Sequence, residues 1–186
     1  NNLQPPREIT DKHYDKQKRW GFDETTRPFY NTDSEYDYDE VKPFDWIRGT
    51  QVGGRSLIWG KQTYRWSDLD FKANLKDGYG VDWPIRYNDL APWYSHVEKF
   101  IGVSGESLNI PHLPDSEFLP PMELNCVENH LKEGISKKYN DRLLTIGRVA
   151  HITEGTKPGA GRSTCQHRNR CGRGCPYGAY FSSNSS

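Results

Sequence analysis

The chain has 186 residues, a length that fits one domain or a large part of one. Its 25 Lys and Arg residues balance 25 Asp and Glu residues, so the total charge indicates neither nucleic acid nor an acidic membrane as a partner. Only 33% of the residues are hydrophobic, yet 13% are aromatic, and a disordered chain would be poor in aromatic residues. We therefore expect a folded domain whose aromatic surface packs on something outside this chain.

The sequence contains no targeting or membrane-spanning segment. No apolar run approaches the roughly 20 residues that cross a bilayer, and the first residues, 1–6, lack the apolar core of a secretory signal. We expect the chain to be an internal piece of a longer protein, so these absences leave its compartment open.

Three regions follow one another along the chain. Residues 1–47 alternate charged and aromatic residues, which indicates an extended acidic arm with its tyrosines against a neighbour. A flexible tail explains that composition equally well. Residues 48–105 contain a glycine-rich stretch followed by a helix, and residues 106–186 contain a proline-rich loop, a second helix, a strand and a cysteine-rich segment.

Two helices and one strand are predicted. Helical spacing places six apolar residues on one face of residues 87–102, which we interpret as core packing: Leu90, Trp93, Tyr94, Val97, Phe100 and Ile101. Asn88 is the expected N-cap and Gly102 the expected end. A second helix is expected over about 122–139, with Leu124, Val127, Leu131 and Ile135 facing inward and Cys126 packed beside them. Residues 143–152 are expected to form a strand.

The glycine-rich stretch around Gly53 and Gly54 has two interpretations. It is either a tight turn without further function or a turn whose backbone lets an anion or cofactor approach. Ser56 can add a hydroxyl donor, and the ring of Trp59 can close over a flat ligand.

This stretch resembles the flavin-contacting turn of the glucose-methanol-choline oxidoreductases, in which Gly-Gly-x-Ser or Gly-Gly-x-Thr is followed by Trp or Asn. The resemblance is closest to the branch of bacterial sugar and gluconate dehydrogenases and pyranose oxidase. The order of later motifs is also similar, including Asp82-Trp83-Pro84-Ile85, Trp93-Tyr94 and Gly102-Val103-Ser104-Gly105. It implies an α+β fold and FAD binding by a set of turn residues: Gly53, Gly54, Arg55, Ser56, Leu57, Trp59 and Gly60.

The resemblance also implies what this chain lacks. The dinucleotide fingerprint Gly-x-Gly-x-x-Gly is absent, and the family places it upstream. The family's catalytic His lies downstream, and none of the six His residues here stands in a matching motif, so no catalytic residue is assigned. Ile58 occupies the position of the flavin-linked His of pyranose oxidase, so FAD would be held non-covalently. We expect a partial FAD-binding and substrate domain that is inactive alone.

Three cysteines, Cys165, Cys171 and Cys175, occur within eleven residues of the C-terminal segment. Converging thiolates favour iron–sulfur clusters or zinc, and structural or redox-active free thiols are the third alternative. The spacing is similar to that of flavin-dependent bacterial glucose dehydrogenases. There it implies a three-iron (3Fe–4S) cluster that passes electrons from the flavin to a cytochrome or another acceptor.

The sequence therefore favours part of an FAD-dependent enzyme that oxidises a CH–OH group of a sugar, sugar acid or other alcohol by hydride transfer. The alternative is a small metal-binding interaction module built around the three cysteines, which the local basic charge of residues 162–173 supports.

Overall fold

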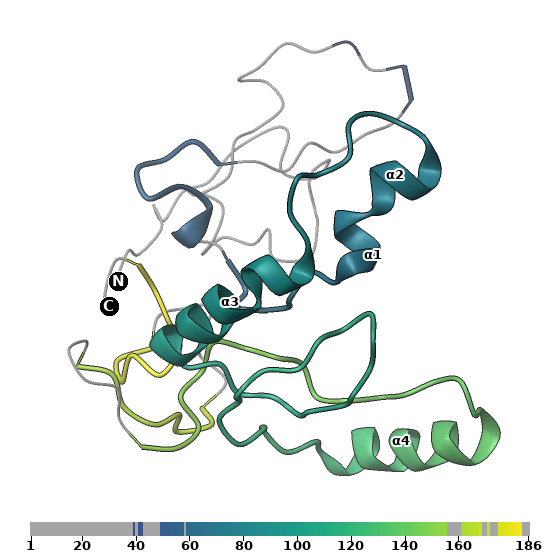
Figure 1. The fold of residues 1–186 in the computed structure, drawn as a ribbon. Coiled ribbons are helices and arrows are strands. Elements are labelled where there is room, and N and C mark those ends of the chain that lie inside the picture. The colour runs from purple at the N-terminus through teal and green to yellow at the C-terminus, as the bar shows by residue number, and fades with distance from the viewer. Residues whose placement is uncertain are drawn as a thin grey trace. The chain divides into compact units, whose positions relative to one another are not determined.

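The structure, a computed structural model, describes residues 39, 41–42, 49–57, 59–155, 161–168, 171 and 175–183 (Figure 1). The chain divides into two compact units, which are described separately. The larger unit consists of Lys61–Arg168 and Tyr177–Phe181. The smaller unit takes the described residues up to Gly60, together with residues 171, 175–176 and 182–183.

Two short helices open the larger unit, α1 (Asp68–Phe71) and α2 (Ala73–Asp77). Helix α1 begins at a capping box, because the Ser67 hydroxyl accepts a hydrogen bond from the Leu69 amide and the Asp70 carboxylate accepts one from the Ser67 amide. Phe71, at the end of α1, is 2% exposed. Its ring packs edge to face against Trp66 and Trp83 at centroid distances of 6.0 and 6.1 Å.

Helix α3 (Tyr87–Ile101) confirms the predicted first helix. It ends at Gly102 as expected, where φ is +72° and the amide donates to the Glu98 carbonyl at 2.9 Å. The N-cap is Arg86 and not Asn88, because the Asp89 carboxylate reaches back and accepts a hydrogen bond from the Arg86 amide at 2.8 Å.

The apolar face of α3 is buried only in part, which corrects the predicted core stripe. Ile101 is 6% exposed, and Leu90 and Tyr94 are half-buried. Trp93 and Phe100 are 67% and 66% exposed, and Val97 is 49% exposed. The six residues occupy a wider arc of α3 than the other residues of the larger unit cover. Half of the stripe therefore faces outward.

Helix α4 (Cys126–Lys138) begins later than expected and is less buried than expected. It begins there because the Asn125 side chain accepts hydrogen bonds from the amides of Val127 and Glu128, both at 3.0 Å. The predicted inward face is wrong for Val127 and Leu131, which are 72% and 52% exposed. Cys126 is exposed and not packed.

The segment of residues 148–152, which bends at Ala150, lies in the core of the larger unit. Val149 exchanges two backbone hydrogen bonds with Ser104, of 2.8 and 3.0 Å, and the Ile152 amide donates to the Ala179 carbonyl at 2.8 Å. These contacts are isolated bridges, so the predicted strand over 143–152 does not appear as a regular strand in the described part of the chain. Ala150 and Ile152 are fully buried. The α+β fold class stays a prediction.

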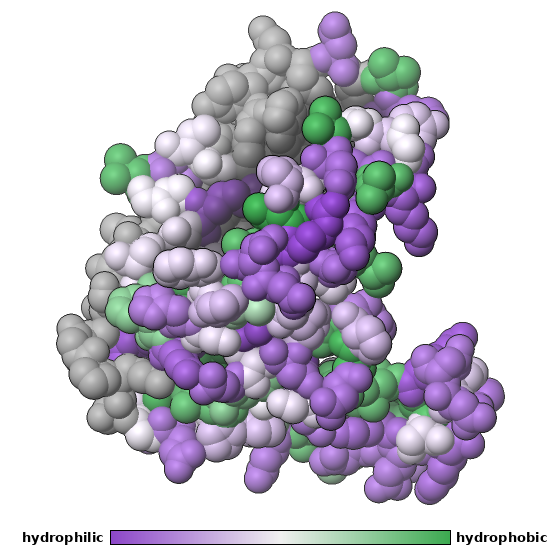
Figure 2. Space-filling view, in the orientation of Figure 1, coloured by the Kyte–Doolittle hydropathy of each residue, from purple (hydrophilic) through white to green (hydrophobic). Residues whose placement is uncertain are grey.

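The surface of the described residues carries many apolar side chains. Figure 2 shows hydrophobic residues reaching the surface at several separate places among polar ones. Among the residues that the structure describes, no helix has both the length and the apolar character needed to cross a membrane.

Candidate functional site

The glycine-rich turn of the smaller unit is a tight reversal followed by a short 3₁₀-helix, Gly54–Leu57. Gly53 and Gly54 have φ of +93° and +54°, a region that side-chain-bearing residues rarely adopt. The Gly54 amide donates to the Gln51 carbonyl at 2.9 Å, and the Gln51 side chain donates back to the Gly54 carbonyl at 3.1 Å. The two glycines are therefore required by the backbone itself.

The turn is also accessible. Gly53, Arg55, Ser56 and Gly60 are exposed, and Trp59 is half-buried. A Cβ added to Gly54 would meet no described atom within 4 Å. The assignment of these turn residues to a cofactor contact stays a prediction. Ile58 and the Leu57 side chain lie outside the described residues.

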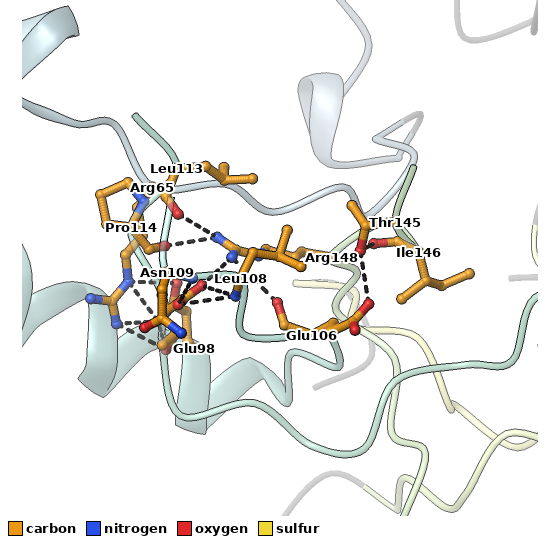
Figure 3. Close-up of polar contacts among 12 residues, drawn as sticks. Arg65, Glu98, Glu106, Leu108, Asn109, Leu113, Pro114, Thr145, Ile146 and Arg148 are labelled. Carbon is orange, nitrogen blue, oxygen red and sulfur yellow. Dashed lines mark hydrogen bonds and ion pairs between the residues drawn. The ribbon is translucent and has the colours of Figure 1, made fainter. Parts of the chain in front are cut away.

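A buried ion pair forms the polar centre of the larger unit (Figure 3). The side chains of Arg65 and Glu98 are 5% and 4% exposed, and Arg65 Nη2 lies 2.6 Å from Glu98 Oε2. Burial by itself would lower the pKa of Arg65, but the hydrogen bonds to Glu98 and Tyr87 raise it above its ordinary value. This guanidinium stays charged and joins α3 to the segment before α1.

Three hydroxyl groups complete the environment of the Arg65–Glu98 pair. The Arg65 guanidinium donates to Tyr87 Oη at 2.8 Å, to Ser95 Oγ at 3.0 Å and to Ser116 Oγ at 2.8 Å. Ser116 also donates to the Glu98 carboxylate. This network holds α3 and the proline-rich loop in one arrangement.

A second pair, Arg148 and Asp115, closes the proline-rich loop (Figure 3). Arg148 Nη2 lies 2.5 Å from Asp115 Oδ1, and the same carboxylate accepts hydrogen bonds from the amides of Leu108 and Asn109. Burial alone would raise the pKa of Asp115, but the two amides and Arg148 hold it below its ordinary value. The carboxylate therefore serves the loop as a structural acceptor.

Cations also surround the central segment of the larger unit. Arg162 is 3% exposed and donates to the carbonyls of Ile101, Gly178 and Ala179, and burial lowers its pKa. Burial and then the charges of Lys61 and Arg162 lower the pKa of His151. The Nδ1 atom of His151 is buried without a hydrogen-bond partner among the described residues. The Arg162 guanidinium is therefore satisfied by backbone carbonyl oxygens.

The three cysteines are divided between the two units. Cys165 belongs to the larger unit, where its amide donates to the Ile152 carbonyl at 2.8 Å and its Sγ accepts a hydrogen bond from the His167 amide at 3.4 Å. Cys171 and Cys175 belong to the smaller unit. Within the described ranges, no three His, Cys, Asp or Glu side chains gather closely enough to hold a metal ion. The shared thiolate site stays a prediction.

Comparison with known proteins points to oxidoreductases. No family model matches the chain. The large subunit of fructose dehydrogenase from Gluconobacter japonicus is 28% identical over 133 residues, which are 70% of this chain and 24% of that protein. The paromamine 6'-oxidase of Streptomyces fradiae is 28% identical over 131 residues, 66% of this chain and 21% of that protein.

A third relative, the 2-methyl-1,2-propanediol dehydrogenase of Mycolicibacterium austroafricanum, is 28% identical over 103 residues, 54% of this chain and 18% of that protein. The chain thus spans less than a quarter of each of these curated relatives. All of them are dehydrogenases or oxidases by name, so the chain is similar to part of several oxidoreductases. This agrees, at that coarse level, with the resemblance to glucose-methanol-choline enzymes.

The polar centre of the larger unit was not predicted from the sequence. Arg65 and Glu98 are 33 residues apart, and Arg148 and Asp115 are also 33 apart. One local feature of the sequence indicates a buried ion pair: Glu98 shares a helical face of α3 with Tyr94 and Ile101. An acidic residue in an apolar stripe indicates a buried basic partner, but the sequence does not say which one.

Proposed function

We propose that this chain is part of an FAD-dependent oxidoreductase of the glucose-methanol-choline type, acting on a CH–OH group of a sugar, sugar acid or other alcohol. The observation that carries the proposal is the open turn at Gly53 and Gly54, whose positive φ angles and accessible main chain suit a flavin contact. It occurs in a chain that is similar to dehydrogenases and an oxidase.

The turn residues would contact and orient the cofactor and would take no part in the bond-breaking step. Two glycines without side chains let the main chain approach the cofactor, the exposed Ser56 hydroxyl donates a hydrogen bond, and Trp59 borders the turn. When bound, FAD supplies the acceptor for the hydride that leaves the substrate carbon. This chain contributes no residue to which we assign proton abstraction, so we expect it to be inactive alone.

The thiolates of Cys165, Cys171 and Cys175 are the residues that would hold a three-iron cluster in the same protein. A cluster there would offer electrons a path to a cytochrome or another acceptor and so favour a dehydrogenase over an oxidase.

Cofactor analysis of the full-length protein tests the proposal. The purified protein is denatured, the released cofactor is identified by chromatography, and iron and zinc are measured on the same sample. We expect one FAD per protein, released without covalent attachment, and bleaching of its absorbance when an oxidisable alcohol or sugar is added anaerobically. Folded protein that carries metal but no flavin would contradict the proposal and support the metal-binding module.

A further inference from the structure

The last stretch of the larger unit, Tyr177–Phe181, is fastened to the segment of residues 148–152. Two backbone hydrogen bonds of 2.8 and 2.9 Å join them: Ile152 N–H to the Ala179 carbonyl and Phe181 N–H to the Ala150 carbonyl. Between these two bonds, His151 and Tyr180 face each other as an antiparallel bridge. We call the two hydrogen bonds and the His151–Tyr180 pair the latch.

Two buried cationic side chains lie beside the latch. The guanidinium of Arg162 donates to the carbonyls of Gly178 and Ala179 at 3.0 and 3.1 Å. The ammonium group of Lys61 lies 4.9 Å from the centre of the Tyr180 ring. Both side chains therefore stabilise Tyr177–Phe181 while they are charged, one through carbonyl oxygens and the other through an aromatic face.

His151 is the group of the latch whose charge changes near neutral pH. Its ring centre lies 6.2 Å from that of Tyr180, and its Nδ1 atom is buried without a hydrogen-bond partner among the described residues. The charged groups of the described residues that act on it are Lys61 and Arg162, both positive. A proton on this imidazole would add a third positive charge to the cluster and would leave a buried N–H without an acceptor.

We propose that protonation of His151 opens the latch, so that Tyr177–Phe181 detaches from residues 148–152 in mildly acidic solution while the rest of the larger unit stays folded. Residues 148–152 remain in place because Val149 also exchanges two backbone hydrogen bonds with Ser104. Detachment of Tyr177–Phe181 brings water to the imidazolium and removes the cost of its burial. This inference concerns the conformation of the chain and stands independently of the proposed flavin contact.

The direction of the pH dependence follows from the pKa of His151. Burial, and then the charges of Lys61 and Arg162, hold this pKa below 6.5 while the latch is closed, and hydration of the open state returns it toward that ordinary value. The closed latch therefore keeps its full stability above pH 6.5. As the pH falls below 6.5, the ratio of open to closed latch should rise by up to about tenfold per pH unit, until the pKa of the closed state is reached.

Native-state hydrogen exchange of the full-length protein, resolved to single amides by mass spectrometry, tests the latch. The amides of Ile152 and Phe181 report on the latch, and the amides of Ser104 and Val149, which donate to each other's carbonyls at 2.8 and 3.0 Å, are the references. After correction for the intrinsic pH dependence of exchange, protection of the two latch amides should fall by up to about tenfold from about pH 6.5 to about pH 5.5. Low urea concentrations should not lower it further, because a local opening exposes little surface.

Two histidine variants of the full-length protein localise the pH dependence. His151→Gln removes the titrating group and should keep the protection of the Phe181 amide constant over this pH range. His130→Gln replaces an exposed histidine of α4 and should leave the wild-type pH dependence unchanged. The comparison of latch and reference amides in the wild-type protein requires neither variant, so it decides the question even where His151→Gln does not fold.

Three results would overturn the latch. Equal protection of the Phe181 amide at both pH values would mean that protonation does not act on Tyr177–Phe181. An equal loss of protection at the reference amides, with the same dependence on urea, would assign the effect to unfolding of the whole unit. A pH dependence that persists in folded His151→Gln protein would assign it to another titrating group.

Discussion

Replacement of Glu98 by Gln perturbs the buried polar centre while preserving side-chain volume. Glu98 accepts from Arg65 Nε at 3.1 Å and from Nη2 at 2.6 Å, and both side chains are about 95% buried. In Glu98→Gln the Arg65 cation remains without a countercharge, and the new amide N–H points toward other donors. Removal of one partner from a buried pair lowers the free energy of unfolding by about 3–5 kcal/mol, a large share of the ~5–15 kcal/mol of a whole domain.

Urea denaturation followed by Trp fluorescence and circular dichroism measures this loss. The matched control is Lys99→Gln on the next residue of α3, because its ion pair with Glu117 is exposed by 55% and 65% and should contribute at most ~1 kcal/mol. With Arg65→Met added, the double variant should lose about 1–3 kcal/mol less than the sum of the single variants. A Glu98→Gln loss no larger than that of the Lys99 control would refute the reasoning.

Three further predictions concern His151, Gly105 and helix α4. Burial and the charges of Lys61 and Arg162 lower the pKa of His151 below its ordinary value of 6.5, so the unfolded chain binds the proton more readily and stability falls as the pH drops below 6.5. In His151→Gln the melting temperature should fall less as the pH drops below 6.5. An unchanged slope of melting temperature against pH would contradict this prediction. Gly105→Ala should destabilise, because its Cβ would lie 2.9 Å from Arg148 Cγ. Gly134→Ala in α4 places a Cβ with no described atom within 4 Å and should raise the free energy of unfolding by up to about 1 kcal/mol. Thermal melts compare the two variants, and a melting temperature of Gly105→Ala at or above that of Gly134→Ala would contradict both expectations.

The sequence predicted those features that depend on near neighbours. The periodicity of α3 and the left-handed Gly102 at its end are local properties, and both were correct. The prediction for α4 was less accurate because Asn125 caps the helix through its own side chain and delays the start. Helix periodicity gives the apolar face but not the partner, so Trp93, Val97, Val127 and Leu131 were wrongly expected to be buried.

The candidate site was predictable only as a set of residues. Glycines with positive φ are implied by Gly53-Gly54 itself, since no other residue tolerates that backbone as well. The distribution of Cys165 and the other two thiols over two units depends on long-range contacts, which spacing along the chain does not contain. The same holds for Arg65 and Glu98, whose pairing is decided by how α3 packs against the segment before α1.

The flavin contact of the glycine turn is the central claim, and one pair of variants tests it directly. Gly54→Ala and Gly155→Ala in the full-length protein both place a side chain at a positive φ, +54° and +66°, with no described atom within 4 Å of the new Cβ. Both should therefore carry the same backbone strain of about 1–2 kcal/mol. The account predicts that Gly54→Ala loses FAD during purification while Gly155→Ala retains it, as measured by the ratio of flavin to protein absorbance. Full flavin content in folded Gly54→Ala protein would contradict the account.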